Sequence, residues 1–283
     1  MDNDPSRPAP ERAWEFLRDA RDEDIPLVWA ALTIARDEYP DLDVAAYEQR
    51  IVDWGKRVRG TAEVDPMQGL RAVNALLYDE IGMSGNQQDY YDPRNSYLNE
   101  VLDRRLGIPI SLGVLQIELA QHAGLPLQGV SFPGHFLLSM PVDGGVLVLD
   151  PYHRGRSIDV QELKSRAQPH VGDQDLHDEQ LSELLAPASN RAILSRMLRN
   201  LKALYVELED WARAVRCADR LLTLDPNLAE EQRDRGLLYL RVGHTAAARA
   251  DLNAYLGRVP PPEDAAKIRD VLVKSGRERS RLN

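Results

Sequence analysis

Hydrophobic positions in the first third of the chain recur every three or four residues. This spacing indicates amphipathic helices, because residues three and four apart share one face of a helix. We expect these helices to form a scaffold, since their sequences offer no chemistry beyond the apolar stripes. The predicted helices cover residues 9–20, 27–39, 44–58 and 65–82.

Two further helices are predicted in the middle of the chain. Asn95 or Ser96 can cap the first of them, and Gly107 supplies the left-handed residue that commonly ends a helix. The second helix begins at about Ser111 and ends at Gly124. Its side chains are almost all apolar, so we expect it to be buried.

After this helix the pattern changes to that of a small antiparallel sheet. Apolar segments over residues 125–132, 137–140 and 146–150 have the length and composition of strands. Asp143-Gly144-Gly145 separates the last two and is typical of a tight turn. We therefore predict a hairpin beside a third strand.

The predicted hairpin places His135 and Asp150 on one face of the sheet. If Asp143 and Gly144 alone form the loop, His135 lies opposite Tyr152 and Asp150 is its diagonal neighbour. A four-residue loop would instead place His135 directly opposite Asp150. An aspartate beside an imidazole can orient the ring, as in a catalytic triad. A purely structural hydrogen bond between the two residues fits the same spacing.

Ser111 is the candidate nucleophile for such a site. A helix N-terminus offers backbone N–H groups and a positive dipole end, which favour a developing anion. Serine is also a preferred residue for capping a helix. The sequence leaves both interpretations open, and capping is the more common role.

The last third of the chain repeats with a period of 34 residues. Such a period is typical of tetratricopeptide repeats, which are helical hairpins in which a small residue allows close approach and a proline ends the unit. We predict two units, over about 195–227 and 228–261, and a final helix over 264–282. The recurring positions are Tyr205 and Tyr239, Ala214 and Ala248, and Pro226 and Pro260.

Charge divides the chain at about the same place. Residues 1–187 carry 17 basic and 32 acidic side chains, whereas residues 188–283 carry 18 basic and 13 acidic ones. We therefore expect one domain over 1–187 and a repeat domain over 188–283. The formal net charge of −10 argues against a nucleic acid partner.

Composition excludes several other kinds of site. A single cysteine, Cys217, excludes an intramolecular disulfide, and we interpret it as a small core residue of the first repeat. The polar segment around residues 170–178 lacks the spacing of metal ligands, so we expect a solvated loop, no metal and no cofactor. The residues concerned are His170, Asp173, Asp175, His177 and Asp178.

We also expect no membrane partner. No apolar run reaches the roughly 18 residues that a transmembrane helix needs. The acidic beginning of the chain is unlike a signal peptide. With one cysteine and no sign of export, the expected location is the cytoplasm.

Four short motifs occur in order along the chain. They are Tyr-Tyr-Asp-Pro-Arg-Asn-Ser-Tyr-Leu-Asn (90–99), Arg-Arg-Leu-Gly-Ile-Pro-Ile-Ser-Leu (104–112), Pro-Gly-His-Phe-Leu (133–137) and Leu-Asp-Pro-Tyr (149–152). With the repeats, they resemble the SirB-type bacterial family, in which a transglutaminase-like domain precedes tetratricopeptide repeats. The resemblance implies an α+β fold: N-terminal helices and a papain-like core of a helix on a small antiparallel sheet, followed by all-α repeats.

The resemblance also implies a site. In transglutaminase-like and papain-like domains a cysteine at a helix N-terminus precedes a histidine and an aspartate on neighbouring strands, and Ser111, His135 and Asp150 follow that order. Asn95 and Tyr91 are the implied binding residues of the same cleft. The chain departs from the pattern at the nucleophile. A hydroxyl has a much higher pKa than a thiol and needs full general-base assistance.

Two functions follow from these observations. The first is a non-catalytic regulatory module, which binds a peptide or protein partner through the degenerate cleft and the repeats. The second is a serine-dependent hydrolase or acyltransferase acting on amide or ester bonds, with Ser111 as nucleophile, His135 as base and Asp150 as orienting residue. The missing cysteine favours the first.

Overall fold

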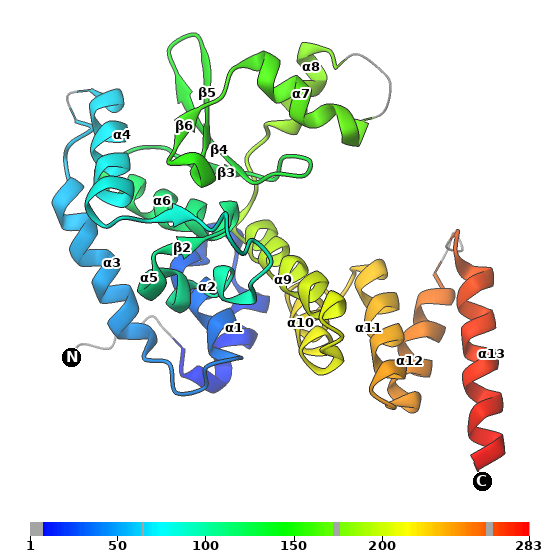
Figure 1. The fold of residues 1–283 in the computed structure, drawn as a ribbon. Helices are drawn as coiled ribbons and strands as arrows, with labels where there is room; N and C mark the ends of the chain where they lie inside the picture. Colours follow the sequence, from blue (N-terminus) through cyan, green and yellow to red (C-terminus); the bar gives the residue numbers. More distant parts are fainter. Residues whose placement is uncertain (1–7, 64, 172–175, 259–262, 283) are drawn as a thin grey trace. The chain divides into compact units, whose positions relative to one another are not determined.

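The computed structural model describes residues 8–63, 65–171, 176–258 and 263–282 (Figure 1). The chain forms two compact units. Residues 1–13 and 19–197 form the first, and residues 14–18 and 198–283 form the second. The fold is α+β as predicted, with helices, a small antiparallel sheet and then helical repeats.

The predicted N-terminal helices are confirmed. They are α1 (Ala13–Asp19), α2 (Leu27–Arg36), α3 (Val44–Val58) and α4 (Pro66–Asn74), which continues as a π-helical segment over Ala75–Glu80. Asp43 and Asp65 cap α3 and α4 by accepting hydrogen bonds from the backbone N–H of Ala46 and Met67. Each cap satisfies a donor that has no partner within its own helix.

Helix α5 (Leu98–Arg104) corrects two predictions about its ends. Its N-cap is Tyr97, not Asn95 or Ser96. The residue in the left-handed conformation at its end is Arg105, with φ of 61°, and not Gly107. Gly107 is needed for a different reason, since a Cβ atom there would lie 2.8 Å from Ser111 Oγ.

Helix α6 (Pro109–Ala123) is the central element of the first unit. It packs against α2, α3 and α4 on one side and against β3 and β4 on another. Gly113 makes the approach to the sheet possible, because a Cβ atom there would lie 2.6 Å from the Phe136 ring. The predicted end at Gly124 is confirmed, and the helix begins two residues before the predicted Ser111.

The sheet contains β3 (Gln128–Val130), β4 (Leu137–Val142), β5 (Gly145–Asp150) and β6 (Arg156–Ser157), in that order and all antiparallel. Val142 pairs with Gly145, so Asp143 and Gly144 alone form the loop of the hairpin. The strand β6 and a short parallel pair, β1 (Ser84–Gly85) with β2 (Leu106–Gly107), had no clear signal in the sequence.

Helices α7 (Val160–Val171) and α8 (Asp178–Leu184) lie beside this sheet (Figure 1). Phe132, Leu137 and Val148 of the sheet region share a buried cluster with Leu163 and Leu181 of the two helices. The structure corrects the loop predicted from residue 170, because His170 belongs to α7. Of the other residues of that segment, Asp173 and Asp175 lie outside the described part.

The segment after α8 joins the edge of the sheet. Val130 bridges to Pro187, and the backbone N–H of Ala188 donates to Gly129 O at 2.7 Å. Helix α9 (Asn190–Glu207) follows, and Asp22 accepts hydrogen bonds from its first backbone N–H groups. The compact units divide after residue 197, within α9, and the boundary at residue 187 stays a prediction.

The second unit has the helical hairpins expected of the repeats. Its elements after α9 are α10 (Trp211–Leu224), α11 (Ala229–Arg241), α12 (Thr245–Leu256) and α13 (Ala265–Leu282). Ala214 and Ala248 are fully buried, and a Cβ atom on Gly236 would lie 2.8 Å from Leu252. These small residues therefore permit the close helix contacts that the repeat predicted. Pro260 lies outside the described residues.

A buried polar network ties the helices of the first unit to the segment after β5. Tyr78 Oη donates to Gln116 Oε1 at 2.7 Å or to Pro151 O at 3.1 Å. Gln116 Nε2 donates to Asn74 Oδ1 at 2.7 Å, and Asn74 Nδ2 reaches Gly155 O at 3.2 Å. Burial raises the pKa of Tyr78, so the phenol stays neutral. The network fixes the loop that begins at Asp150.

No helix in the described ranges is long and apolar enough to cross a membrane.

Replacing Tyr78 with Phe tests this network. The change should lower the free energy of unfolding by about 1–3 kcal/mol, because it leaves buried acceptors on Gln116 and Pro151 without their donor. Tyr90→Phe is the matched control, since that ring is 42% exposed, and it should cost far less. Urea denaturation of both variants measures the difference, and equal losses would contradict the role given to the network.

Candidate functional site

Ser111 lies in the first turn of α6 and is fully buried. Its Oγ accepts a hydrogen bond from Ile108 N at 3.1 Å. Its proton is directed to Asn95 O at 2.7 Å or to Ile108 O at 3.1 Å. A hydroxyl has one proton to donate, and these contacts already use it. The structure therefore places Ser111 as a residue that caps the start of α6 and joins it to the segment around Asn95.

Asn95 is also fully buried. Its Nδ2 donates to Asp89 O at 2.7 Å, and its Oδ1 accepts from Asn86 Nδ2 at 3.0 Å. With the contact from Ser111, these bonds hold the loop from Asn86 to Asn95 against the start of α6. A side chain engaged in this way organises the loop that carries Tyr90 and does not itself face solvent.

His135 lies in the tight turn before β4, where its backbone N–H donates to Phe132 O at 3.0 Å. The register of β4 and β5 is the one in which His135 falls opposite Tyr152, with Asp150 on the diagonal. Both positions lie at or beyond the ends of the paired strands. This agrees with the two-residue loop among the predicted alternatives.

The Asp150 carboxylate, 2% exposed, has several donors. It accepts from the backbone N–H groups of Tyr152 and His153, at 3.0 and 3.3 Å, and so begins a 3₁₀ turn at Pro151. Asp150 Oδ2 is hydrogen-bonded to His153 Nδ1 at 2.8 Å and to Arg166 Nη1 at 2.9 Å. Its imidazole partner is thus His153, three residues away on the same turn.

The charges around these groups move their pKa values. Burial alone would raise the pKa of Asp150, but the hydrogen bonds and charges of His153 and Arg166 hold it below the ordinary value. Burial lowers the pKa of His135, and the charges of Arg166, His170 and Arg196 lower it further, while Asp150 acts in the opposite direction. The imidazole of His135 therefore stays neutral near pH 7.

Two members of the predicted triad, His135 and Asp150, share one face in the register of the hairpin. Asp150 raises the pKa of His135 by its charge, and the two side chains are not hydrogen-bonded to each other. Within the described ranges, Ser111 hydrogen-bonds to neither of them, since its partners are Ile108 and Asn95. The full triad stays a prediction, and the hydrogen-bonded pair in this structure is Asp150 with His153.

Sequence reasoning missed His153 and Arg166 as the partners of Asp150. A signal for His153 was available, because an aspartate before proline often caps a turn, which brings a side chain three residues later close to the carboxylate. Arg166 gave no comparable signal. It reaches Asp150 only because α7 folds back onto the sheet, which a sequence pattern does not reveal.

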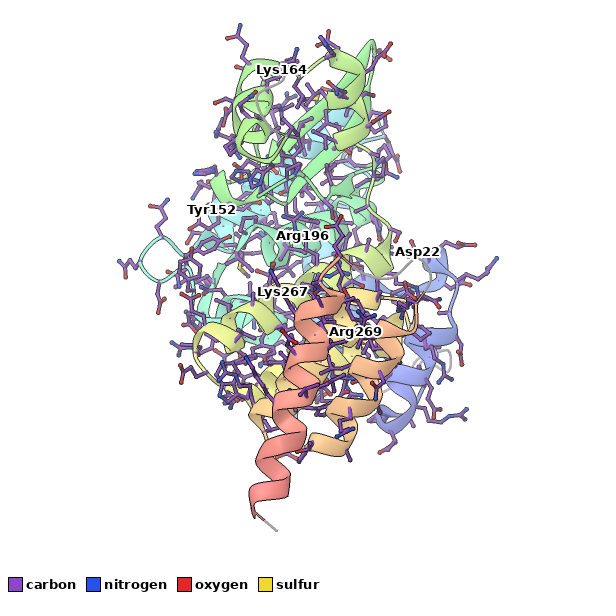
Figure 2. The ribbon with its side chains drawn as sticks, turned by 90° about the vertical axis from the view of Figure 1, so that its right-hand side faces the viewer. Asp22, Tyr152, Lys164, Arg196, Lys267 and Arg269 are labelled. Carbon is purple, nitrogen blue, oxygen red and sulfur yellow. The ribbon has the colours of Figure 1, made fainter. Side chains whose placement is uncertain are left out.

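Aromatic rings surround the same turn. Tyr90, Tyr91 and Tyr152 form edge-to-face pairs, with Tyr90 5.3 Å from Tyr91 and 5.8 Å from Tyr152 between ring centroids. Tyr152 Oη donates to Asn86 O at 2.8 Å, and its ring packs where a Cβ atom of Gly85 would lie. Tyr91 is 66% exposed, so this predicted binding residue is available to a ligand. Figure 2 locates Tyr152 among the side chains.

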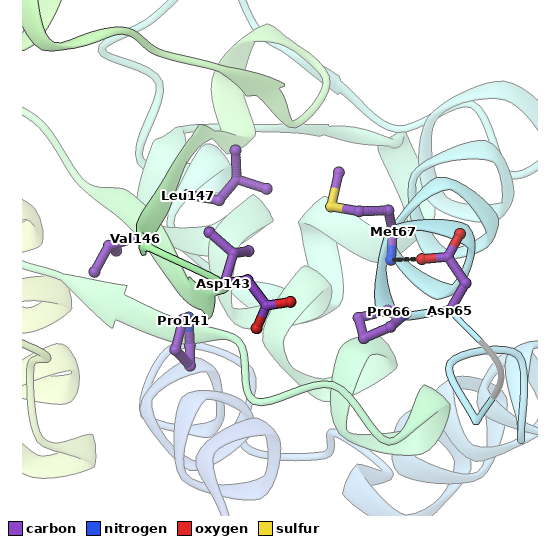
Figure 3. A pocket seen from close by; sticks show the side chains of 8 residues that line it. Asp65, Pro66, Met67, Pro141, Asp143, Val146 and Leu147 are labelled. Atoms are coloured by element: carbon purple, nitrogen blue, oxygen red, sulfur yellow. Dashed lines mark hydrogen bonds between the residues drawn. The ribbon is translucent and has the colours of Figure 1, made fainter.

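An open groove of about 700 Å³ runs between the start of α4 and the β4–β5 hairpin, and Asp65, Met67, Pro141 and Val146 are among its lining residues (Figure 3). Within the described ranges no cluster of His, Cys, Asp and Glu has the arrangement of a metal site. Cys217 is buried in α10, as a core residue should be.

Comparison with known proteins agrees with this architecture. The sequence profile of the transglutaminase-like superfamily matches residues 45–199, and that of the tetratricopeptide repeat matches residues 201–273. The chain thus carries a transglutaminase-like domain followed by tetratricopeptide repeats, as the resemblance to the SirB-type family implied. No solved structure matches the chain.

Similar proteins extend over most of the chain. A UPF0162 protein of Xylella fastidiosa is 49% identical over 94% of this chain and 95% of its own length. One from Vibrio cholerae is 34% identical over 70% of this chain and 72% of its own length. Human F-box only protein 21 is 34% identical over 48% of this chain but 22% of its own length. The chain belongs to the UPF0162 family.

Replacing Ser111 with Ala tests its capping role. The change should cost about 1–3 kcal/mol of stability, because the N–H of Ile108 and the carbonyl of Asn95 lose a buried partner. Ser96→Ala is a matched control. Ser96 is equally inaccessible, but its hydroxyl has no hydrogen-bond partner among the described residues. Comparable losses from the two substitutions, measured by urea denaturation, would contradict the capping role.

The lowered pKa of His135 predicts a pH effect. The unfolded chain protonates this histidine near the ordinary value of 6.5, whereas the folded chain does so only at lower pH. Folding stability should therefore fall as pH drops from that value through the lowered one. His135→Gln should reduce the loss between about pH 7.5 and 5.5. Denaturation at both pH values checks this, and an unchanged loss in His135→Gln would oppose it.

Proposed function

We propose that this protein is a non-catalytic regulatory module, which binds a peptide or protein partner through its transglutaminase-like domain and its repeats. One observation carries the proposal. The hydroxyl of Ser111, the predicted counterpart of the family nucleophile, is fully buried, and its proton is directed to a backbone carbonyl of Asn95 or Ile108. A nucleophile needs its lone pair and proton free for a substrate and a base.

The surroundings of Asp150 support the same conclusion. In a triad the aspartate orients the imidazole that receives the proton of the nucleophile. Here the carboxylate is shared between His153 and Arg166. Within the described ranges no hydroxyl or thiol is hydrogen-bonded to the His153 ring, so this pair has no nucleophile beside it. Asp150 instead holds the turn and α7 in place.

The repeats supply the second part of the proposal. Tetratricopeptide repeats generally act in protein–protein interaction. Several charges on α9 and α11 form ion pairs within the second unit, such as Lys202 with Glu231 and Asp234. On α13 the exposed Lys267 and Arg269 present positive charge (Figure 2). Such a helix suits a partner with negative charge.

A thiol at the nucleophile position tests the absence of catalysis. We expect Ser111→Cys, made together with Cys217→Ser, to react slowly with iodoacetamide at neutral pH, because the position is buried. Adding His135→Ala should leave the rate unchanged, since no imidazole activates the thiol. Mass spectrometry of the alkylated chain gives the rates. Fast labelling that depends on His135 would overturn the proposal in favour of the hydrolase or acyltransferase.

The wild-type chain provides an independent readout. A fluorophosphonate reagent, which labels activated serines, should leave Ser111 unmodified. Peptides selected for binding to the full chain should be recovered intact after long incubation. Cleavage or acyl transfer that is lost in Ser111→Ala would likewise contradict the proposed non-catalytic binding function.

A further inference from the structure

The turn Phe132–His135 is approached by basic side chains from two elements, α7 and α9. Phe132 O accepts hydrogen bonds from both His135 N, at 3.0 Å, and Arg196 Nη1, at 3.2 Å. Gly134, with φ of 68°, lies against the His170 ring, because a Cβ atom there would be 2.4 Å from His170 Nε2. Arg196 of α9 and His170 of α7 thus both approach the turn that carries His135.

The acidic groups nearby are already paired. Asp150 is hydrogen-bonded to His153 and Arg166. Glu162 is held by Arg156 at 2.5 Å and by Arg166 at 2.6 Å. Neither carboxylate is therefore available to balance the charge of Arg196.

Arg196 is the unbalanced cation of this region. Its contacts are the carbonyl of Phe132 and the ring of Phe136, whose centroid lies 5.9 Å from the guanidinium carbon. Within the described ranges no carboxylate forms an ion pair with it. The side chain is half-buried, and this burial lowers its pKa. This guanidinium has lost part of its hydration and has no anion in its place. Binding an anion would therefore stabilise it.

Exposed aromatic rings are connected to the His135 turn through Tyr152. The ring centroid of Tyr90 lies 5.8 Å from that of Tyr152, which falls opposite His135 in the register of the hairpin. Arg196 is among the charges that act on the pKa of the Tyr90 phenol. Tyr90 and its edge-to-face neighbour Tyr91 are 42% and 66% exposed. Tyrosine and arginine are enriched among the residues that contribute most to protein interfaces. A planar guanidinium also matches the geometry of a carboxylate.

We propose that Arg196, the His135 turn and the rings of Tyr90 and Tyr91 bind a carboxylate of a partner peptide, with the adjoining peptide packed on the tyrosines. The inference rests on the proposed function in that it names the chemistry of the partner. A glutamate or aspartate side chain and a chain terminus offer the same carboxylate. The geometry of Arg196 suits either source.

Fluorescence anisotropy with the full chain tests this site. The first probe is a dye-labelled octapeptide with four glutamates and an amidated end. The second has glutamines in their place and the same amide, and the third has glutamines and a free terminal carboxylate. We expect the first or the third to bind at least tenfold more tightly than the second. Equal affinity for all three would overturn the proposal, as would stronger competition by inorganic phosphate than by acetate.

The arginine is tested with a matched control. Arg196→Gln should weaken binding of the preferred probe at least tenfold. Arg36→Gln should leave it unchanged, because Arg36 is also half-buried and also donates to a backbone carbonyl, that of Pro10. Arg196→Lys, which keeps the charge but loses the planar fork, should bind with intermediate affinity. Undiminished binding by Arg196→Gln would refute the site.

The pKa of His135 is a further measurement, and it would not change if Arg196 had only a structural role. The groups facing it are Arg166 and His170 of α7, Asp150 of β5 and Arg196 of α9. A bound carboxylate should raise the pKa of His135, which NMR of the imidazole nitrogens detects in the wild type and in Arg196→Lys. No change on saturation with the probe would also refute the site. Loss of this site would leave the proposed binding function standing, whereas turnover of the probe would remove that function.

Discussion

The burial of α6 is the constraint on which the first unit depends. Most of its residues are inaccessible, from Ile110 to Ala123, so water cannot satisfy the donors at its beginning. Buried N–H groups of that kind need partners from the protein itself. Ser111 supplies one for Ile108 and passes its own proton to the carbonyl of Asn95 or Ile108. Ser111, which the sequence predicts as a candidate nucleophile, is thus the residue that satisfies buried polar groups where a core helix begins.

A second consequence follows at the other end of the domain. Asp150 ends β5, begins a turn and receives Arg166 from α7, so one carboxylate joins three elements. The hydroxyl of Tyr78 lies within hydrogen-bond distance of Gln116 Oε1 and of Pro151 O, and so fixes the residues that follow Asp150. Because these hydrogen bonds are buried, water does not compete for them. The exposed groups of this region, Tyr91 and His153 among them, are therefore presented on a fixed frame.

The elements in which apolar residues recur at a regular spacing were predictable from the sequence. The residues at which these elements begin and end were harder to predict. Helix α3 and the Asp143-Gly144 loop agree with the patterns, because apolar spacing and turn residues determine them locally. Asn95 shows why the site was harder to predict. An asparagine before a helix looks like a cap, and only the distant contacts with Asn86 and Ser111 reveal its buried role. Arg196 gave no signal for the same reason, since its partner Phe132 lies more than 60 residues away.

The β4–β5 hairpin has a further consequence, for association between copies of the chain. Strand β6 pairs with β5 only at Leu149 and Asp150, so among the described residues the strand near Val146, which is 56% exposed, has a neighbour on one side only. An open strand edge of this kind can recruit another strand and lead to aggregation. On the other edge of the hairpin, β3 pairs with β4 only as far as Ser139. Pro141 lies beyond that point and offers no N–H to an added strand, and Asp143 adds a charge at the tip. Loss of both residues would therefore make the hairpin more prone to pair with a strand of another copy of the chain.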